Sequence, residues 1–146
     1  MTTFGIAAGA EEALHPSGGI GIRKELRATY DEALTRVPEA LKSEGFGVLT
    51  EIDVQRTLKQ KLGVDFRRYE ILGACNPPFA HQALQAEIEI GLMLPCNVVV
   101  YENDEKLAVV LAVDPTKTMA STGNPKLVEL AAAVKEKLTR ALARLE

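Results

Sequence analysis

The sequence predicts an α+β fold, a two-layer sandwich in which helices cover one face of a mostly antiparallel sheet. Three observations predict it. Short apolar runs typical of strands alternate with helical periods along the chain. A turn signal at Asn103–Asp104 joins two late strands into a hairpin, and a long amphipathic helix follows Asn124–Pro125. This order favours helices that are segregated to one face of an antiparallel sheet.

Length and composition indicate one ordinary globular domain. The 146 residues fit a single domain at 19–146, preceded by a loose tail at 1–18 that shows no apolar period. Apolar residues make up 47% and charged residues 25%, which is usual for a globular protein with its own core. The net charge of −3, with acids and bases interspersed, argues against a nucleic-acid surface.

The sequence also favours a cytoplasmic protein with reduced thiols. No apolar run reaches the ~20 residues that cross a bilayer, so we expect no membrane association. The N-terminus lacks the basic and apolar regions of a secretory signal. Two cysteines in a chain of this length do not form a disulfide framework.

The first elements follow from local signals. Alternating apolar and polar residues predict a strand at 19–27. Thr29 and Glu32 form a capping box, which opens a helix that ends at Gly45. Pro38 falls inside this helix and should kink it, because proline removes one backbone hydrogen bond.

The rest of the chain continues the same alternation. Asn76 and Pro77 are typical of a helix N-cap and its first turn. Pro95 should mark a sheet edge or a bulge. The predicted elements are a strand at 46–53, a helix at 54–62, a strand at 66–75, a helix at 79–86, strands at 91–102 and 106–113, a loop at 116–123 and the final helix.

The strand around Val98, Val99 and Val100 is apolar on both faces. Helices on one side of the sheet would leave the other side open to solvent. We therefore expect a homodimer that buries the second sheet face.

The candidate site lies where the two cysteines meet. Cys75 ends one predicted strand and Cys96 lies near the start of the next, so the fold should bring both thiols to the same end of the sheet. Asn76 and Asn97 each follow a cysteine, and His81 lies between them. These five residues are the predicted ligand-binding set.

Several interpretations of this set stay open. Both cysteines can be small core residues, with His81 an exposed helix residue and the asparagines loop caps. Alternatively, they can line a pocket for a small molecule or a metal, with His81 as a third soft ligand. The separation of 21 residues is unlike the short paired spacings of strong metal sites.

Two other classes of function compete with ligand binding. Cys75 precedes a helix N-terminus, which lowers a thiol pKa, and His81 could serve as its base, as in a thiol-dependent redox or sulfur-transfer enzyme. A dimeric structural or regulatory partner domain is the remaining class. We favour small-ligand or metal binding near Cys75 and Cys96; the sequence names no cofactor and leaves enzymatic activity undecided.

Four blocks of sequence carry a family resemblance: G-V-L-T-E-I-D, L-G-V-D-F, I-L-G-A-C-N-P-P-F-A-H-Q-A-L and L-P-C-N-V-V-V-Y-E. Through them the chain resembles the domain of unknown function family 302 over 20–119. The resemblance implies a fold like one half of the TATA-box-binding protein, with the order β-α-β4-α, and it implies dimers. It brings no catalytic assignment and implies nothing about DNA. The family's marked positions fall on Gly73, Cys75, Asn76, Pro77, Ala80, Pro95, Cys96 and Asn97.

Overall fold

The computed structural model describes residues 15–17 and 20–146, which form an antiparallel sheet of six strands in the order β1-β2-β6-β5-β4-β3. The strands are β1 (His15–Ser17), β2 (Gly21–Glu25), β3 (Gly47–Asp53), β4 (Tyr69–Cys75), β5 (Cys96–Glu102) and β6 (Ala108–Val113). The helices are α2 (Tyr30–Ser43), α3 (Val54–Leu62), α4 (Pro77–Ala86), α5 (Pro115–Thr118) and α6 (Pro125–Ala143), with 3₁₀ segments η1 (Ile88–Met93) and η2 (Ala120–Thr122).

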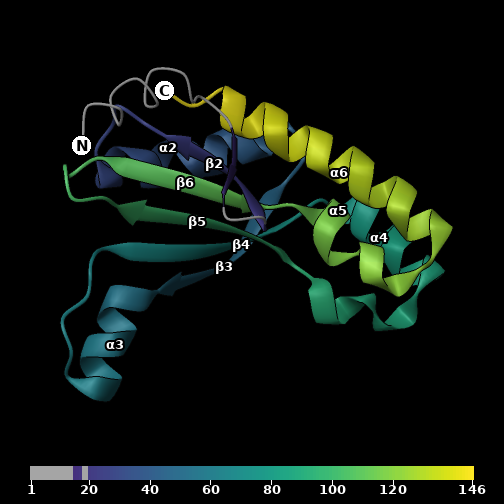
Figure 1. Ribbon diagram of the computed structural model, residues 1–146, viewed down its shortest axis with the longest axis horizontal. Coiled ribbons are helices and arrows are strands. Elements are labelled where there is room, and N and C mark those ends of the chain that lie inside the picture. Colours follow the sequence, from purple (N-terminus) through teal and green to yellow (C-terminus); the bar gives the residue numbers. More distant parts are fainter. Residues whose placement is uncertain (1–14, 18–19) are drawn as a thin grey trace.

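Helices α2 and α6 cover one face of the sheet, so the predicted two-layer α+β sandwich is confirmed (Figure 1). Alternate residues of the central strands point into this interface because strand side chains alternate between faces. The strand residues that form this core are Leu72, Ala74, Val98, Val100, Val110 and Ala112, all at most 2% exposed. Val37 and Leu41 of α2 and Leu138 and Leu142 of α6 pack against them.

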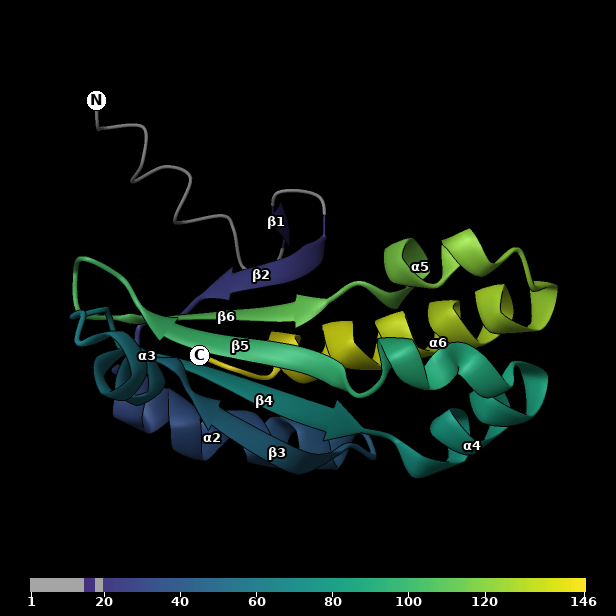
Figure 2. The same cartoon turned by 90° about the horizontal axis from the view of Figure 1, so that it is seen from below.

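We call the opposite side of the sheet the open face (Figure 2). The strand register places one apolar row across it, in the order Ile52, Ile71, Val99 and Leu111. Ile52 is exposed and the other three are half-buried. A second row brings Tyr69 beside Tyr101, whose rings stack with centroids 5.8 Å apart. The apolar character on both sides of the sheet is therefore present as the sequence predicts.

The capping signals of the two large helices are confirmed. The side chain of Thr29 accepts a hydrogen bond from the Glu32 amide, and the Glu32 carboxylate accepts one from the Thr29 amide. Pro38 lies inside α2, and Gly45 lies just beyond the end of this helix with φ 88°. The Asn124 side chain caps α6, whose apolar stripe is buried along its length. Local chemistry fixes these boundaries.

The strand predicted at 91–102 is wrong in its first part. The chain forms η1 there, and β5 begins only at Cys96. Cys96 pairs with Ala74 near the end of β4, so residues before Cys96 have no strand to pair with. Ile90 instead turns into the core, while Ile88 and Leu92 stay exposed.

The other predicted strands also start later than expected, including two that follow a loop or a turn. The strand expected from Phe66 begins at Tyr69, and the one expected from Lys106 begins at Ala108. In the second case Asn103 holds the turn, because its side chain accepts hydrogen bonds from the Glu105 and Leu107 amides.

The predicted tail contains a strand, since His15–Ser17 pairs antiparallel with β2. Residues 1–14 and 18, which complete that prediction, lie outside the described residues.

Candidate functional site: an apolar cavity with two thiols

The fold brings the two cysteines to one end of the sheet. Cys75 is the last residue of β4, and Cys96 is the first residue of β5. Ala74 pairs directly with Cys96, so the two thiols belong to neighbouring positions of adjacent strands. From this end of the sheet, α4 and the first half of α6 extend beyond the strands (Figure 1).

A small cavity of about 30 Å³ lies at this junction, and we call it the thiol-lined cavity. It separates two groups of core residues: the main core between sheet and helices, and a second cluster formed by α4, η1 and α6. Its walls are almost wholly apolar. The lining residues are Phe46, Ala74, Cys75, Asn76, Phe79, Ala80, Ala83, Leu94, Pro95, Cys96, Met119, Leu130 and Val134.

The two thiols differ in their surroundings. Cys96 is buried, with 8% of its surface exposed, whereas Cys75 is half-buried. Burial raises the pKa of Cys96 to about 11, and the nearby Cys75 adds to the increase. The low polarity disfavours the charged thiolate, so Cys96 stays protonated near neutral pH. Cys75 is the more accessible of the two.

Asn76 lines the cavity in a fixed orientation. It is buried, and its Nδ2 donates a hydrogen bond of 3.2 Å to the carbonyl oxygen of Glu44 at the end of α2. Asn76 occupies the N-cap position of α4, as predicted from sequence, but its side chain does not cap that helix. The contact with α2 takes its place, because a buried amide needs a partner.

A glycine permits the close approach of the cavity wall to the sheet. A Cβ atom added at Gly73 would lie 2.2 Å from Thr50 Oγ1 and 2.8 Å from Pro95 Cγ. Pro95, which follows a cis peptide bond from Leu94, can therefore pack against β4 only because residue 73 has no side chain. The same proline lines the cavity beside Cys96.

The other two predicted residues lie elsewhere. His81 is exposed on α4, and Asn97 is exposed on β5; neither lines the thiol-lined cavity. Within the part of the chain that the structure describes, no three His, Cys, Asp or Glu side chains come together as a metal site would require. The structure thus joins Cys75, Asn76 and Cys96, and leaves His81 and Asn97 apart from them.

Several residues of the candidate site and its surroundings escaped sequence reasoning. Phe79, Met119 and Leu130 complete the walls, and in the sequence they are ordinary apolar positions of helices and loops. Glu44 is buried and paired with Arg140 at 3.1 Å and Arg144 at 2.9 Å. No local signal marks a pair separated by about a hundred residues in the chain.

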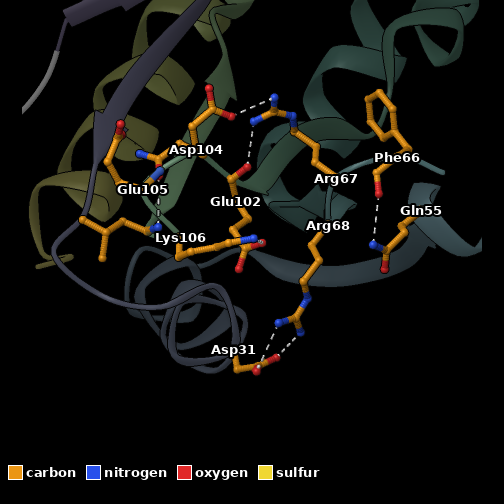
Figure 3. A network of polar contacts seen from close by, with 11 residues as sticks. Asp31, Gln55, Phe66, Arg67, Arg68, Glu102, Asp104, Glu105 and Lys106 are labelled. Carbon is orange, nitrogen blue, oxygen red and sulfur yellow. Dashed lines mark hydrogen bonds and ion pairs between the residues drawn. The ribbon is translucent and has the colours of Figure 1, made fainter.

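A second polar cluster surrounds the β5–β6 hairpin (Figure 3). Arg67 donates hydrogen bonds to the Glu102 carbonyl at 3.0 Å and to the Asp104 carboxylate at 3.3 Å. Arg68 pairs with Asp31 of α2. Each of these arginines already forms an ion pair with a carboxylate of the same chain. The cluster therefore links the hairpin, the loop before β4 and α2. It is a weaker candidate for a ligand site than the thiol-lined cavity.

Fold and site together define a small two-layer α+β domain with a thiol-lined cavity at one end of its sheet. The chain belongs to the family described as "Domain of unknown function DUF302", whose model matches residues 22–145.

A solved relative supports this assignment. The chain is similar to an uncharacterized conserved DUF302 protein from Bacillus stearothermophilus, with 32% sequence identity and a TM-score of 0.82. The similarity covers 88% of this chain and 100% of that one. No curated protein matches the chain. Within the described residues, no helix is both long and apolar enough to span a membrane.

Proposed function

We propose that this domain binds a small, mostly apolar molecule in the thiol-lined cavity. One observation carries the proposal: two strand ends and one helix N-terminus bring Cys75, Cys96 and the fixed Asn76 amide to the same apolar cavity. Pockets of this kind combine apolar walls with a few placed polar groups. Here the sulfur atoms would supply soft, polarizable contacts and Asn76 a single polar contact.

The size of the cavity limits the ligand. A volume of about 30 Å³ holds roughly two water molecules, and apolar walls disfavour water. A molecule of a few heavy atoms therefore fits the cavity as it stands. A larger one requires some of the walls to move outward, for example the Leu94–Pro95 segment or α4.

A metal and an enzymatic role receive less support. Cys75 and Cys96 offer two sulfur ligands, and the described residues supply no third ligand beside them. A thiol enzyme would need an activated cysteine and a base. Cys75, the nucleophile of that hypothesis, lines the cavity, but its expected base His81 is exposed on α4 and lies outside the cavity. Cys96 is a poor nucleophile, because burial raises its pKa. We also propose a cytoplasmic location, where reducing conditions keep both thiols free.

Xenon, a small apolar atom that enters dry cavities, is the probe that tests the proposal. Methyl resonances of Leu94, Met119 and Leu130 should shift as xenon pressure rises in NMR spectra of the reduced protein. Ala80→Leu fills the cavity from α4 and should abolish these shifts. Ala132→Leu, at an exposed position of α6, is the matched control and should retain them.

Two outcomes would overturn the proposal. One is a wild-type protein whose cavity methyl groups do not respond to xenon. The other is a response that persists unchanged in Ala80→Leu, since the xenon would then occupy a different place.

A further inference from the structure

Exposed apolar side chains concentrate around the open face. Of the nine large hydrophobic residues that the described part of the chain exposes, seven lie in three segments: β3, α3 with its following loop, and η1. Among these seven, the most exposed are Leu92 at 90%, Ile88 at 79%, Leu62 at 68% and Leu49 at 66%. Single exposed apolar residues are ordinary, but a gathering of this kind marks an interaction surface.

The shape of the molecule gives this surface two raised ends. Helix α3 and segment η1 project from the same side of the sheet, at opposite ends of its strands, and the open face lies between them (Figures 1 and 2). None of the side chains of α3 is buried, so the helix stands away from the core. The apolar row from Ile52 to Leu111 crosses the space between the two projections.

The two projections carry opposite charge. Helix α3 contains Arg56, Lys59 and Lys61 and no acidic residue. Asp65 of the following loop pairs with Lys59 at 3.0 Å, so Arg56 and Lys61 supply the positive charge of this projection. The segment 87–93 contains Glu87 and Glu89 and no basic residue. Each projection also presents exposed leucine or isoleucine beside its charges. One chain therefore carries both halves of a complementary contact.

We propose that a second copy of this chain docks on the open face, with α3 of each copy against η1 of the other. A two-fold axis that crosses the strands produces this arrangement, because it exchanges the two ends of the sheet. An axis parallel to the strands would instead place α3 against α3 and bring like charges together. Two-fold dimers form through self-complementary surfaces. The charge pattern therefore favours a second copy of this chain as the partner, in the orientation that brings α3 against η1.

Analytical ultracentrifugation of the full chain over a wide concentration range tests the contact. The wild type should reach a dimer, and Leu92→Lys should raise the dimer dissociation constant at least about tenfold, because it places a positive charge in the apolar contact opposite the basic helix α3. Leu92 is exposed in the single chain, so this variant should fold normally, as circular dichroism would show.

A charge exchange tests the orientation. Lys61→Glu and Glu89→Lys should each weaken the dimer, and the double variant should restore most of the affinity. Arg36→Glu with Glu39→Lys makes the same exchange on exposed positions of α2, on the helical side, and should leave the dimer unchanged.

A monomer at every concentration would overturn the proposal. A dimer whose dissociation constant is unchanged by Leu92→Lys would place the interface elsewhere. A double variant weaker than either single variant would exclude the proposed orientation of α3 against η1.

Discussion

At the scale of single residues, the site depends on a position without a side chain. Gly73 faces Thr50 on one neighbouring strand and Pro95 on the segment that leads into β5. Glycine there is required by space and not by backbone conformation, since its φ lies outside the left-handed region. The resemblance marks Gly73, but only the structure explains it.

Gly73→Ala should destabilise the fold by about 1–3 kcal/mol, because the added methyl group overlaps two neighbours. Thr50→Ala in the same chain should recover part of the loss, while the contact with Pro95 remains. Urea denaturation measures both effects. Gly91→Ala is the control, since a Cβ there meets nothing within 4 Å. Equal stabilities for the two glycine variants would contradict the packing argument.

Cys96 makes the stability depend on alkaline pH. Its pKa is raised from 9.0 to about 11 in the folded chain, mainly by burial and then by Cys75. The unfolded chain therefore releases this proton first, and stability falls as pH rises from about 9 to about 11. The loss attributable to this group is about 2–3 kcal/mol.

Denaturation of the reduced protein at several pH values checks this expectation. Cys96→Ala should be less stable at neutral pH, because it leaves a small void, but its stability should fall less between about pH 9 and about pH 11. Parallel losses in both proteins would assign the alkaline effect to other groups, such as Tyr30, whose burial raises its pKa to about 12.

At the scale of elements, buried carboxylates join helices that are distant in sequence. Glu44 follows the last turn of α2 and accepts hydrogen bonds from Arg140 and Arg144 of α6. Its main-chain oxygen accepts a bond from Asn76, so the same residue also orients a wall of the cavity. Asp114 joins α5 to Lys135 of α6 in a similar way, at 2.9 Å.

Glu44→Gln should destabilise the protein at neutral pH and much less in acid. Hydrogen bonds from Arg140, then Arg144, lower the pKa of Glu44 below its ordinary value of 4.5. The stability it contributes is therefore present above about 4.5 and is lost as pH falls through the lowered folded-state pKa. Urea midpoints at about pH 7 and about pH 3 measure the difference. Glu39→Gln, exposed on α2, is the control; a Glu44→Gln deficit of the same size at both pH values would contradict the prediction.

At the scale of the whole molecule, α6 unites two groups of core residues. Its first half packs in the second cluster through Leu127, Leu130 and Ala131. Its second half packs on the sheet through Val134, Leu138 and Leu142. The thiol-lined cavity lies between these groups, so any motion that enlarges it must shift α4 relative to a helix that both groups share.

Leu127→Ala and Leu138→Ala should each lower the free energy of unfolding by about 2–5 kcal/mol, since both side chains are fully buried. Because α6 crosses both groups, unfolding should remain a single transition. Circular dichroism and the methyl signal of Met119 should report the same midpoint in each variant. Val128→Ala, at an exposed position of α6, should cost little. Separate midpoints would show that the second cluster unfolds on its own.

The sequence by itself determined the features that depend on near neighbours in the chain. The capping box at Thr29 and Glu32, the start of α6 at Asn124 and the alternation in β2 follow from local hydrogen bonding and from the periods of helix and strand. The antiparallel arrangement with helices on one face follows from the order of these elements.

Tertiary structure alone decided the rest. Where β5 begins depends on where β4 ends, and the roles of Glu44, Gly73 and Asn76 depend on partners from other elements. The same holds for His81, which lies near the cysteines in sequence but faces solvent. A cavity is a space that several packed elements leave unfilled. Its position depends on how those elements pack, so no local sequence pattern predicts it.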